Sequence, residues 1–364
     1  MIKKIIFGTL TVGLLLAVLA PGLARAQGRI AILDSSVEAD FPVILRFNLS
    51  AESDAVINDI RLQYTVDNES FTRVISEAYL EFVPDSLVDV SWEWDMRRTG
   101  GLPSGSMVEY WWIIEDNRGD RLVTRPETVT FDDDRYYWQS LNEGMVTIYW
   151  YQGNQDFADD IMLTIQQSKL RLTTDTGAYL KKPIRMYIYS DPADLQGAMI
   201  FPQEWTGGVT FTRYGTIAIG ISPQSLEWGR RAIVHELTHM VVHQMTFNPY
   251  AGLPSWLEEG MAMFSEGELD GNFVDLLERA VADDSLISVR SLASPFSTDA
   301  DEARLGYAQS YSLVELLVDS YGRDKILELL NAFRRGSTYD EALEQVYGFD
   351  MDGLNDLWRE HVVR

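Results

Sequence analysis

Three of the four histidines in this 364-residue chain lie close together, at His235, His239 and His243. The chain around them has no glycine or proline from Arg230 to Met245, which predicts one continuous helix. Side chains four residues apart lie on the same face of a helix, so His235 and His239 project together. Two imidazoles in this arrangement can bind one zinc ion through their nitrogens.

The glutamate between these two histidines has a different predicted role. Glu236 directly follows His235, so it lies beside a metal that the histidines hold rather than on it. There it can accept a proton from water, because zinc lowers the pKa of bound water to about 7. The alternative is a core helix with buried histidines, but two imidazoles and a carboxylate are costly to bury without a partner.

A catalytic zinc site needs a third protein ligand and one open position. A third histidine six residues after the second, the metzincin arrangement, is absent because that position is Met245. His243 lies one turn past the second histidine and has rotated away, so we expect it to pack near the site or to support a ligand. The acidic candidates for the third ligand are Glu258 and Glu259 in the next predicted helix.

The segments HELTH and LPSWLEEGMA together resemble the zinc sites of gluzincin metallopeptidases. The resemblance is closest to bacterial exported peptidase MA-like proteins, and it extends more distantly to the aminopeptidase-N-like and thermolysin-like families. It covers residues 136–364 and implies that the third ligand is Glu259, which precedes Gly260 in a W-L-x-E-G pattern. The spacing from the second histidine fits Glu258 better, so Glu258 stays open as the alternative.

The resemblance also implies a tyrosine or histidine that stabilises the oxyanion. Tyr307 and Tyr311 are the candidates, and packing in the core is the alternative for both. Glu266 matches an acidic position of aminopeptidase-N-like sequences, where it would orient a zinc-bound histidine. The Gly-x-Met-Glu-Asn run that binds a free amino terminus in aminopeptidases is absent, so exopeptidase activity is not implied.

Residues 27–134 contain short segments rich in β-branched and aromatic residues, such as VILRFNLS and INDIRLQYTV, separated by turn segments. About seven strands with no helical period predict a β-sandwich of immunoglobulin or fibronectin type. The Arg-Gly-Asp sequence at 118–120 is expected to form a hairpin turn rather than an adhesion motif.

Residues 135–364 predict an α+β zincin-like metallopeptidase domain with a mainly helical C-terminal half. MVTIYWY and IRMYIYS are expected strands, and QDFADDIMLTIQQSKLRLTTDTG between them is an expected amphipathic helix. GGVTFTRYGTIAIGIS adds one or two strands, which could supply an edge strand that pairs with an extended peptide or be ordinary strands of the sheet. Ser222 and Pro223 then suit the start of the histidine-bearing helix.

Residues 1–26 have the pattern of a signal peptide. Lys3 and Lys4 precede an apolar run, and Ala24-Arg25-Ala26 forms a small-x-small cleavage site. An uncleaved anchor is the alternative, but the apolar run is short for a membrane span. We therefore expect a protein that is secreted, periplasmic or at the cell surface, with no stable membrane span after cleavage.

Composition narrows the chemistry further. The chain has no cysteine, which excludes disulfides, thiolate metal sites and a cysteine nucleophile. Its formal charge is −25, and removal of residues 1–26 makes it −28. Such a charge repels phosphate backbones and argues against a nucleic-acid partner.

These observations predict an exported zinc metallopeptidase that acts on a peptide or protein substrate, with His235, His239 and Glu259 as metal ligands and Glu236 as general base. Two other readings stay open. One is a non-catalytic binding or assembly protein on a peptidase-like fold, and the other is a hydrolase of a non-peptide amide such as one in the cell wall. Cell-surface contact through the N-terminal domain is also a possibility that the domain order suggests.

Overall fold

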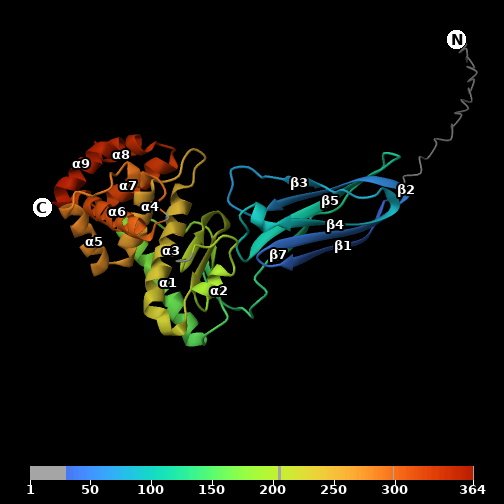
Figure 1. Ribbon diagram of the computed structural model, residues 1–364, viewed down its shortest axis with the longest axis horizontal. Coiled ribbons are helices and arrows are strands. Elements are labelled where there is room, and N and C mark those ends of the chain that lie inside the picture. The colour runs from blue at the N-terminus through green and yellow to red at the C-terminus, as the bar shows by residue number, and fades with distance from the viewer. Residues whose placement is uncertain (1–29, 204–205, 298, 364) are drawn as a thin grey trace, which may run out of the picture.

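The computed structural model describes residues 30–203, 206–297 and 299–363. It forms a strand-rich lobe from the first part of the chain and a largely helical lobe from the last part (Figure 1). The predicted signal peptide lies outside the described residues. Within the described ranges, no helix has both the length and the apolar character needed to cross a membrane.

The N-terminal lobe is built from seven antiparallel strands, as the sequence predicts in number. Their bounds are Ala31–Asp40 (β1), Ile44–Val66 (β2), Ser76–Tyr79 (β3), Asp85–Asp95 (β4), Ser106–Asp116 (β5), Arg121–Val123 (β6) and Glu127–Phe131 (β7). The first part of β2 pairs with β1 and β4, and its second part pairs with β3 and β5. The Arg-Gly-Asp sequence lies in the turn between β5 and β6, which pair antiparallel.

The prediction of two separate strands between residues 43 and 66 is wrong, because β2 is continuous over 23 residues. Its buried positions are odd-numbered up to Ile57 and even-numbered from Ile60. The pairing with β5 shifts register between Ile57 and Asp59, and one extra residue in a strand moves the following side chains to the other face. β2 pairs with β1, β3, β4 and β5, and β5 also pairs with β6 and β7, so the seven strands form one connected sheet. An immunoglobulin-type sandwich stays a prediction.

The C-terminal lobe begins with a five-stranded sheet in the order β11-β12-β10-β9-β8. The strands are Gln139–Glu143 (β8), Val146–Trp150 (β9), Ile184–Tyr189 (β10), Gly208–Phe211 (β11) and Thr216–Gly220 (β12). The three central strands are parallel, and the two edge strands β8 and β11 run antiparallel to them. The predicted strands around β9 and β10 are confirmed. Of the two alternatives for GGVTFTRYGTIAIG, β11 is an edge strand and β12 is an interior strand.

Nine helices of the described residues cover or follow this sheet. They are Gln155–Thr176 (α1), Pro192–Gln196 (α2), Leu226–Thr246 (α3), Ser255–Glu266 (α4), Gly271–Ala282 (α5), Ala300–Tyr321 (α6), Arg323–Arg334 (α7), Tyr339–Tyr347 (α8) and Met351–Val362 (α9). The residues predicted to start the histidine-bearing helix form a short 3-10 turn, Pro223–Ser225, and α3 itself begins at Leu226. The N-terminal lobe and these helices enclose separate apolar cores.

The helix that follows α3 lies unusually close to α6. At Gly260 in α4, a side chain would collide with the carbonyl oxygen of Ser310 and the side chain of Val314, both on α6. A residue without a Cβ is therefore required for this approach. The close contact brings α3, α4 and α6 together around one region.

Two sets of contacts join the lobes. Asp133 is fully buried and pairs with Arg135 at 2.6 Å, and it also accepts a hydrogen bond from Tyr189 of β10 at 3.1 Å. In the second set, Phe71 of the β2–β3 loop stacks on Phe247 at the end of α3, with ring centroids 4.3 Å apart. The boundary between residues 134 and 135 stays a prediction.

Candidate metal centre

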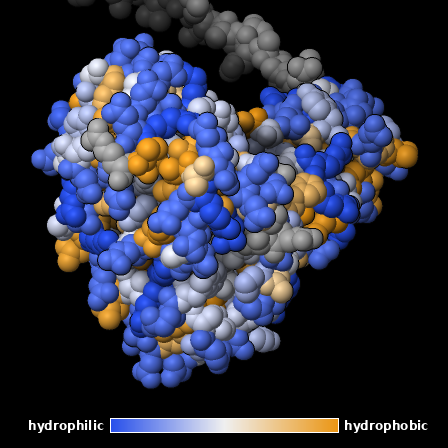
Figure 2. Space-filling view, turned by 60° about the vertical axis from the view of Figure 1, so that its left-hand side comes forward, coloured by the Kyte–Doolittle hydropathy of each residue, from blue (hydrophilic) through white to orange (hydrophobic). Residues whose placement is uncertain are grey.

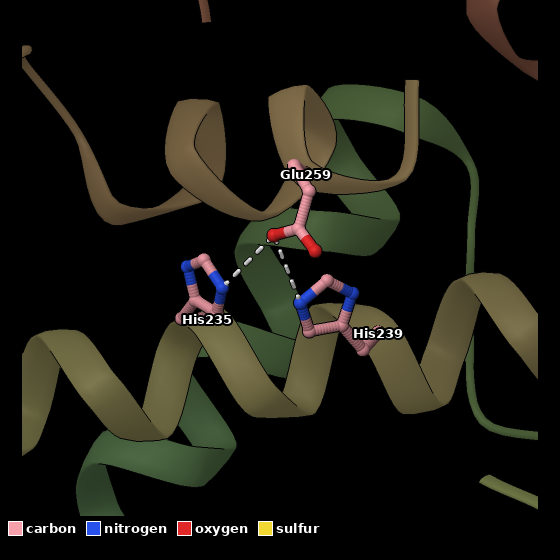
Figure 3. A group of neighbouring side chains, drawn as sticks. All are labelled: His235, His239 and Glu259. Carbon is pink, nitrogen blue, oxygen red and sulfur yellow. Dashed lines mark ion pairs between the residues drawn. The ribbon is translucent and has the colours of Figure 1, made fainter. Parts of the chain in front are cut away.

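The structure brings together His235 and His239 of α3 with Glu259 of α4 (Figure 3). One carboxylate oxygen, Oε2 of Glu259, lies 3.5 Å from Nε2 of His235 and 3.5 Å from Nε2 of His239. One ligand atom from each residue can be chosen so that all three lie within 4.8 Å of one another. The three side chains therefore point at one common position.

The arrangement of these atoms fits a zinc ion. Oε2 of Glu259 is buried and has no hydrogen-bond partner, although both imidazoles face it. In a tetrahedral site with bonds of ~2.0–2.1 Å, neighbouring ligand atoms are about 3.4 Å apart. The distance from Oε2 of Glu259 to Nε2 of each histidine, 3.5 Å, is close to this value. Two imidazole nitrogens and one carboxylate oxygen are also a donor set that catalytic zinc uses.

A second carboxylate fixes the orientation of one histidine. Oε1 of Glu266 lies 2.8 Å from Nδ1 of His235, on the side of the ring opposite Nε2. The other oxygen of Glu266 accepts a hydrogen bond from Nε of Arg231 at 3.2 Å. The contact predicted between Glu266 and a histidine of the site is therefore present, and it directs Nε2 of His235 towards Glu259.

The charges at the site favour an imidazolium–carboxylate cluster when no metal is bound. Burial by itself lowers the pKa of His235, but the carboxylates of Glu259 and Glu266 outweigh it and raise the pKa to about 10. The pKa of His239 is also raised, since Glu259 outweighs its burial. Burial raises the pKa of Glu259, but the two histidines lower it to about 2. Metal binding must therefore displace protons from this cluster.

The two candidate glutamates of α4 are placed differently. Glu259 completes the three-residue group, whereas the nearest carboxylate oxygen of Glu258 lies 3.8 Å from Nδ1 of His239. Nδ1 is the ring nitrogen of His239 that does not face Glu259. The geometry thus places Glu259, and not Glu258, at the position shared with both histidines.

Glu236 lies beside this group and is held by the edge strand β11. The hydroxyl of Thr210 donates to Oε2 of Glu236 at 2.7 Å and also lies 2.9 Å from the backbone oxygen of Glu236. A side chain at Gly208 would lie 2.8 Å from Oε1 of Glu236. The strand therefore fixes one carboxylate oxygen and leaves room for the other.

The two candidate tyrosines separate in the structure. Tyr307 lines a cavity of about 540 Å³ together with His235 and Glu236. Burial raises the pKa of Tyr307, and the negative charges of Glu259 and Glu236 raise it further. Tyr311 lines a different cavity, and its hydroxyl lies 3.0 Å from Glu315. Tyr307 alone of the two is thus brought to the histidine cluster.

His243 does not join the metal cluster. Its Nε2 lies 3.3 Å from a carboxylate oxygen of Glu69, which belongs to the β2–β3 loop of the N-terminal lobe. Burial lowers the pKa of His243, and the positive charges of Arg213 and Lys182 act in the same direction against Glu69. The packing alternative for His243 is therefore the one that the structure shows, at the contact between the lobes.

Sequence reasoning missed Thr210 and Gly208. The sequence marked their segment as an edge strand, but a strand pattern does not tell which helix the strand faces. The hydroxyl of Thr210 meets Glu236 only because β11 lies beside α3. The double glycine at residues 207 and 208 was the one local signal, because glycine in a strand often marks a close approach.

The three clustered side chains form a group that could hold a metal ion. The chain belongs to the Peptidase MA superfamily, whose family model matches residues 164–364, more than half of its length. The predicted resemblance to peptidase MA-like gluzincins is thereby confirmed. A search of curated proteins found no match.

Solved structures similar to this chain include two peptidases and OgpA. Aminopeptidase A of Legionella pneumophila, in complex with aspartic acid, has 12% identity and a TM-score of 0.42 over 90% of this chain and 50% of its own. A two-domain M1 zinc metallopeptidase with L-arginine bound has 11% identity and a TM-score of 0.42 over 92% of this chain and 95% of its own. OgpA of Akkermansia muciniphila, with an O-glycopeptide, has 9% identity and a TM-score of 0.23, and the match spans 30% of OgpA and 29% of this chain.

Proposed function

We propose that this protein is an exported zinc-dependent metallopeptidase that hydrolyses peptide bonds. The observation that carries the proposal is the convergence of His235, His239 and Glu259 on one position directly beside Glu236. Membership of the Peptidase MA superfamily supports the reaction class. Export rests on the sequence pattern of residues 1–26.

His235, His239 and Glu259 would hold the zinc ion, which lowers the pKa of water and polarises the substrate carbonyl. Glu236 accepts a proton from the attacking water as the new bond from oxygen to carbonyl carbon forms. It then gives this proton to the nitrogen of the leaving amine as the carbon–nitrogen bond breaks. Thr210 keeps Oε2 of Glu236 in place, so Oε1 is the oxygen that is free for this transfer.

Tyr307 is the side chain in the cavity that is suited to stabilise the oxyanion. Its hydroxyl is a donor at neutral pH, because burial and the nearby carboxylates keep its pKa above the ordinary value. A hydrogen bond from a positioned donor to the developing negative charge lowers the barrier to reaction. Tyr311 has no such role in the proposal.

The test combines metal content with two substitutions. We expect the mature protein, purified without chelator or metal-affinity tag, to carry about one zinc per chain, in line with a three-ligand catalytic site. His235→Ala should lose the metal, whereas Glu236→Gln should keep it and lose turnover of a general protein substrate such as casein. Zinc-free protein that takes up no added zinc, or full turnover by Glu236→Gln, would contradict the proposal.

A further inference from the structure

One arginine of the metal-site cavity has no acidic partner. Arg304 lines the cavity that also contains His235, Glu236 and Tyr307. Its guanidinium lies over the ring of Phe273 on α5, with Cζ 5.6 Å from the ring centroid, and it forms no ion pair within 4 Å among the described residues. The other arginine of the cavity, Arg231, is instead paired with Glu266.

Other arginines of the described residues, such as Arg98 and Arg279, also form no ion pair, although the protein has 55 acidic and 30 basic residues. The feature that sets Arg304 apart is its position in the metal-site cavity. Asp301 lies one helical turn before Arg304, yet it forms no ion pair with it in the described structure. Figure 2 shows a surface that is hydrophilic over most of this view, with hydrophobic residues in small separate clusters.

The acidic side chains that face the same cavity are occupied or distant. Asp270 accepts hydrogen bonds from the backbone and the side chain of Asn272, at 3.0 and 2.9 Å. Glu266 pairs with Arg231 and His235, and Glu236 is held by Thr210. The negative charge of Asp270 acts on Arg304 at longer range without an ion pair within 4 Å.

The position of Arg304 suits a ligand. Contact with the face of Phe273 holds the guanidinium by a cation–π interaction and leaves its N–H edges free. These N–H groups can bind a carboxylate through two parallel hydrogen bonds. Arg304 precedes Tyr307 by three residues on α6, so both side chains project on the same side of the helix into the cavity.

We propose that Arg304 binds a carboxylate of the substrate peptide in the cavity beside the metal site. The carboxylate belongs either to an acidic side chain or to the C-terminus of the peptide. That the ligand is a peptide rests on the proposed function. The carboxylate site adds a substrate preference that the zinc site alone does not give. It makes acidic peptides, or peptides with a free C-terminus, the favoured substrate class.

The experiment measures peptide binding separately from turnover. Zinc-loaded Glu236→Gln protein is titrated by calorimetry with matched peptides built from alanine, leucine and glycine. One pair carries glutamate or glutamine at the centre and has an amidated C-terminus. The other pair has glutamine at the centre and a free or amidated C-terminus. The two pairs distinguish a side-chain carboxylate from a terminal one.

Arg304→Met in the same background should weaken binding of the preferred carboxylate peptide on the order of tenfold, as expected for loss of a charge-assisted hydrogen-bonded pair in a solvent-accessible cavity. Binding of the glutamine peptide with an amidated end should not change. Arg279→Met is the matched control, because Arg279 is an exposed arginine on α5 that does not line the cavity. Arg304→Lys keeps the charge without the two-pronged geometry and should weaken binding less.

Equal binding of all peptides by the Arg304 variants and the parent protein, or no binding of any peptide, would overturn the carboxylate site. Turnover of the same peptides by the zinc-loaded protein with Glu236 intact tests the proposed function independently. Arg304-dependent binding without cleavage would support the carboxylate site and contradict the proposed peptidase activity. Cleavage of the preferred carboxylate peptide that is unaffected by Arg304→Met would support the peptidase activity and contradict the carboxylate site.

Discussion

At the scale of single residues, the site depends on how its carboxylates are held. Glu259 is held by the two histidines, Glu266 by His235 and Arg231, and Glu236 by Thr210. Glu259 and Glu266 share His235, and Glu236 has a different partner. In the proposed mechanism, Glu259 would bind the metal, Glu266 would orient His235 and Glu236 would carry a proton.

The role of Thr210 can be tested by removing its hydroxyl. Thr210→Val keeps the shape of the side chain but frees Oε2 of Glu236, so we expect turnover to fall about tenfold while zinc content stays at the parental level. Thr210→Ser keeps the hydroxyl and should retain most of the activity. Steady-state kinetics together with metal analysis make the comparison, and equal turnover by the valine and serine variants would show that Thr210 does not position Glu236.

At the scale of elements, the centre depends on three helices that pack against one another. Helix α3 supplies the two histidines, α4 supplies Glu259 and Glu266, and α6 supplies Tyr307 and Arg304. The contact between α4 and α6 is possible because residue 260 has no side chain. The glycine next to Glu259 is therefore explained by helix packing.

A methyl group at this position should force the two helices apart. We expect Gly260→Ala to lower the free energy of unfolding by about 1–3 kcal/mol, the usual cost of overpacking a core, and to weaken zinc binding. Gly252→Ala is the matched control, since a side chain at Gly252 meets nothing within 4 Å. Denaturant unfolding with and without zinc measures both effects. Equal stability of the two variants would show that α4 can shift without cost.

At the scale of the whole molecule, the lobes share contacts that reach the histidine-bearing helix. Glu69 lies against His243 of α3 and pairs with Lys182 at 2.6 Å, while Phe71 stacks on Phe247. Near the predicted boundary, Asp133 pairs with Arg135 and accepts from Tyr189. The N-terminal lobe therefore supports the helical lobe as well as being a candidate for substrate or cell-surface contact.

These contacts predict the behaviour of a shortened chain. A protein that begins at Arg135 loses Asp133 and exposes the apolar surface that residues such as Ile200 bury against the N-terminal lobe. We expect its melting temperature to fall by roughly 5 °C or more relative to a chain that begins at residue 27, with zinc present in both. Calorimetry measures the difference. The same melting temperature for both chains would mean that the helical lobe is stable without the N-terminal lobe.

Much of the fold follows from local patterns in the sequence. The strand patterns predict seven strands before residue 134, and Thr338 with Glu341 predicts a helix start that the structure confirms as a capping box. The patterns failed where the buried side chains of one strand switch to the other face of the sheet without a turn residue, as in β2. There the bulge is defined by pairing with β5, where Ile57 lies opposite Asp116, a residue far away in the chain.

The sequence by itself determined the histidine pair and its neighbouring glutamate, because their relation depends on helical spacing alone. Only the tertiary structure shows that Glu259, and not Glu258, lies beside both histidines, and that Tyr307, and not Tyr311, lines the cavity with His235. Neighbouring residues on a helix point in different directions, so the packing of α4 and α6 against α3 determines which of them reaches the site. The contact of Thr210 with Glu236 and the unpaired Arg304 likewise arise from elements that meet in space and not in sequence.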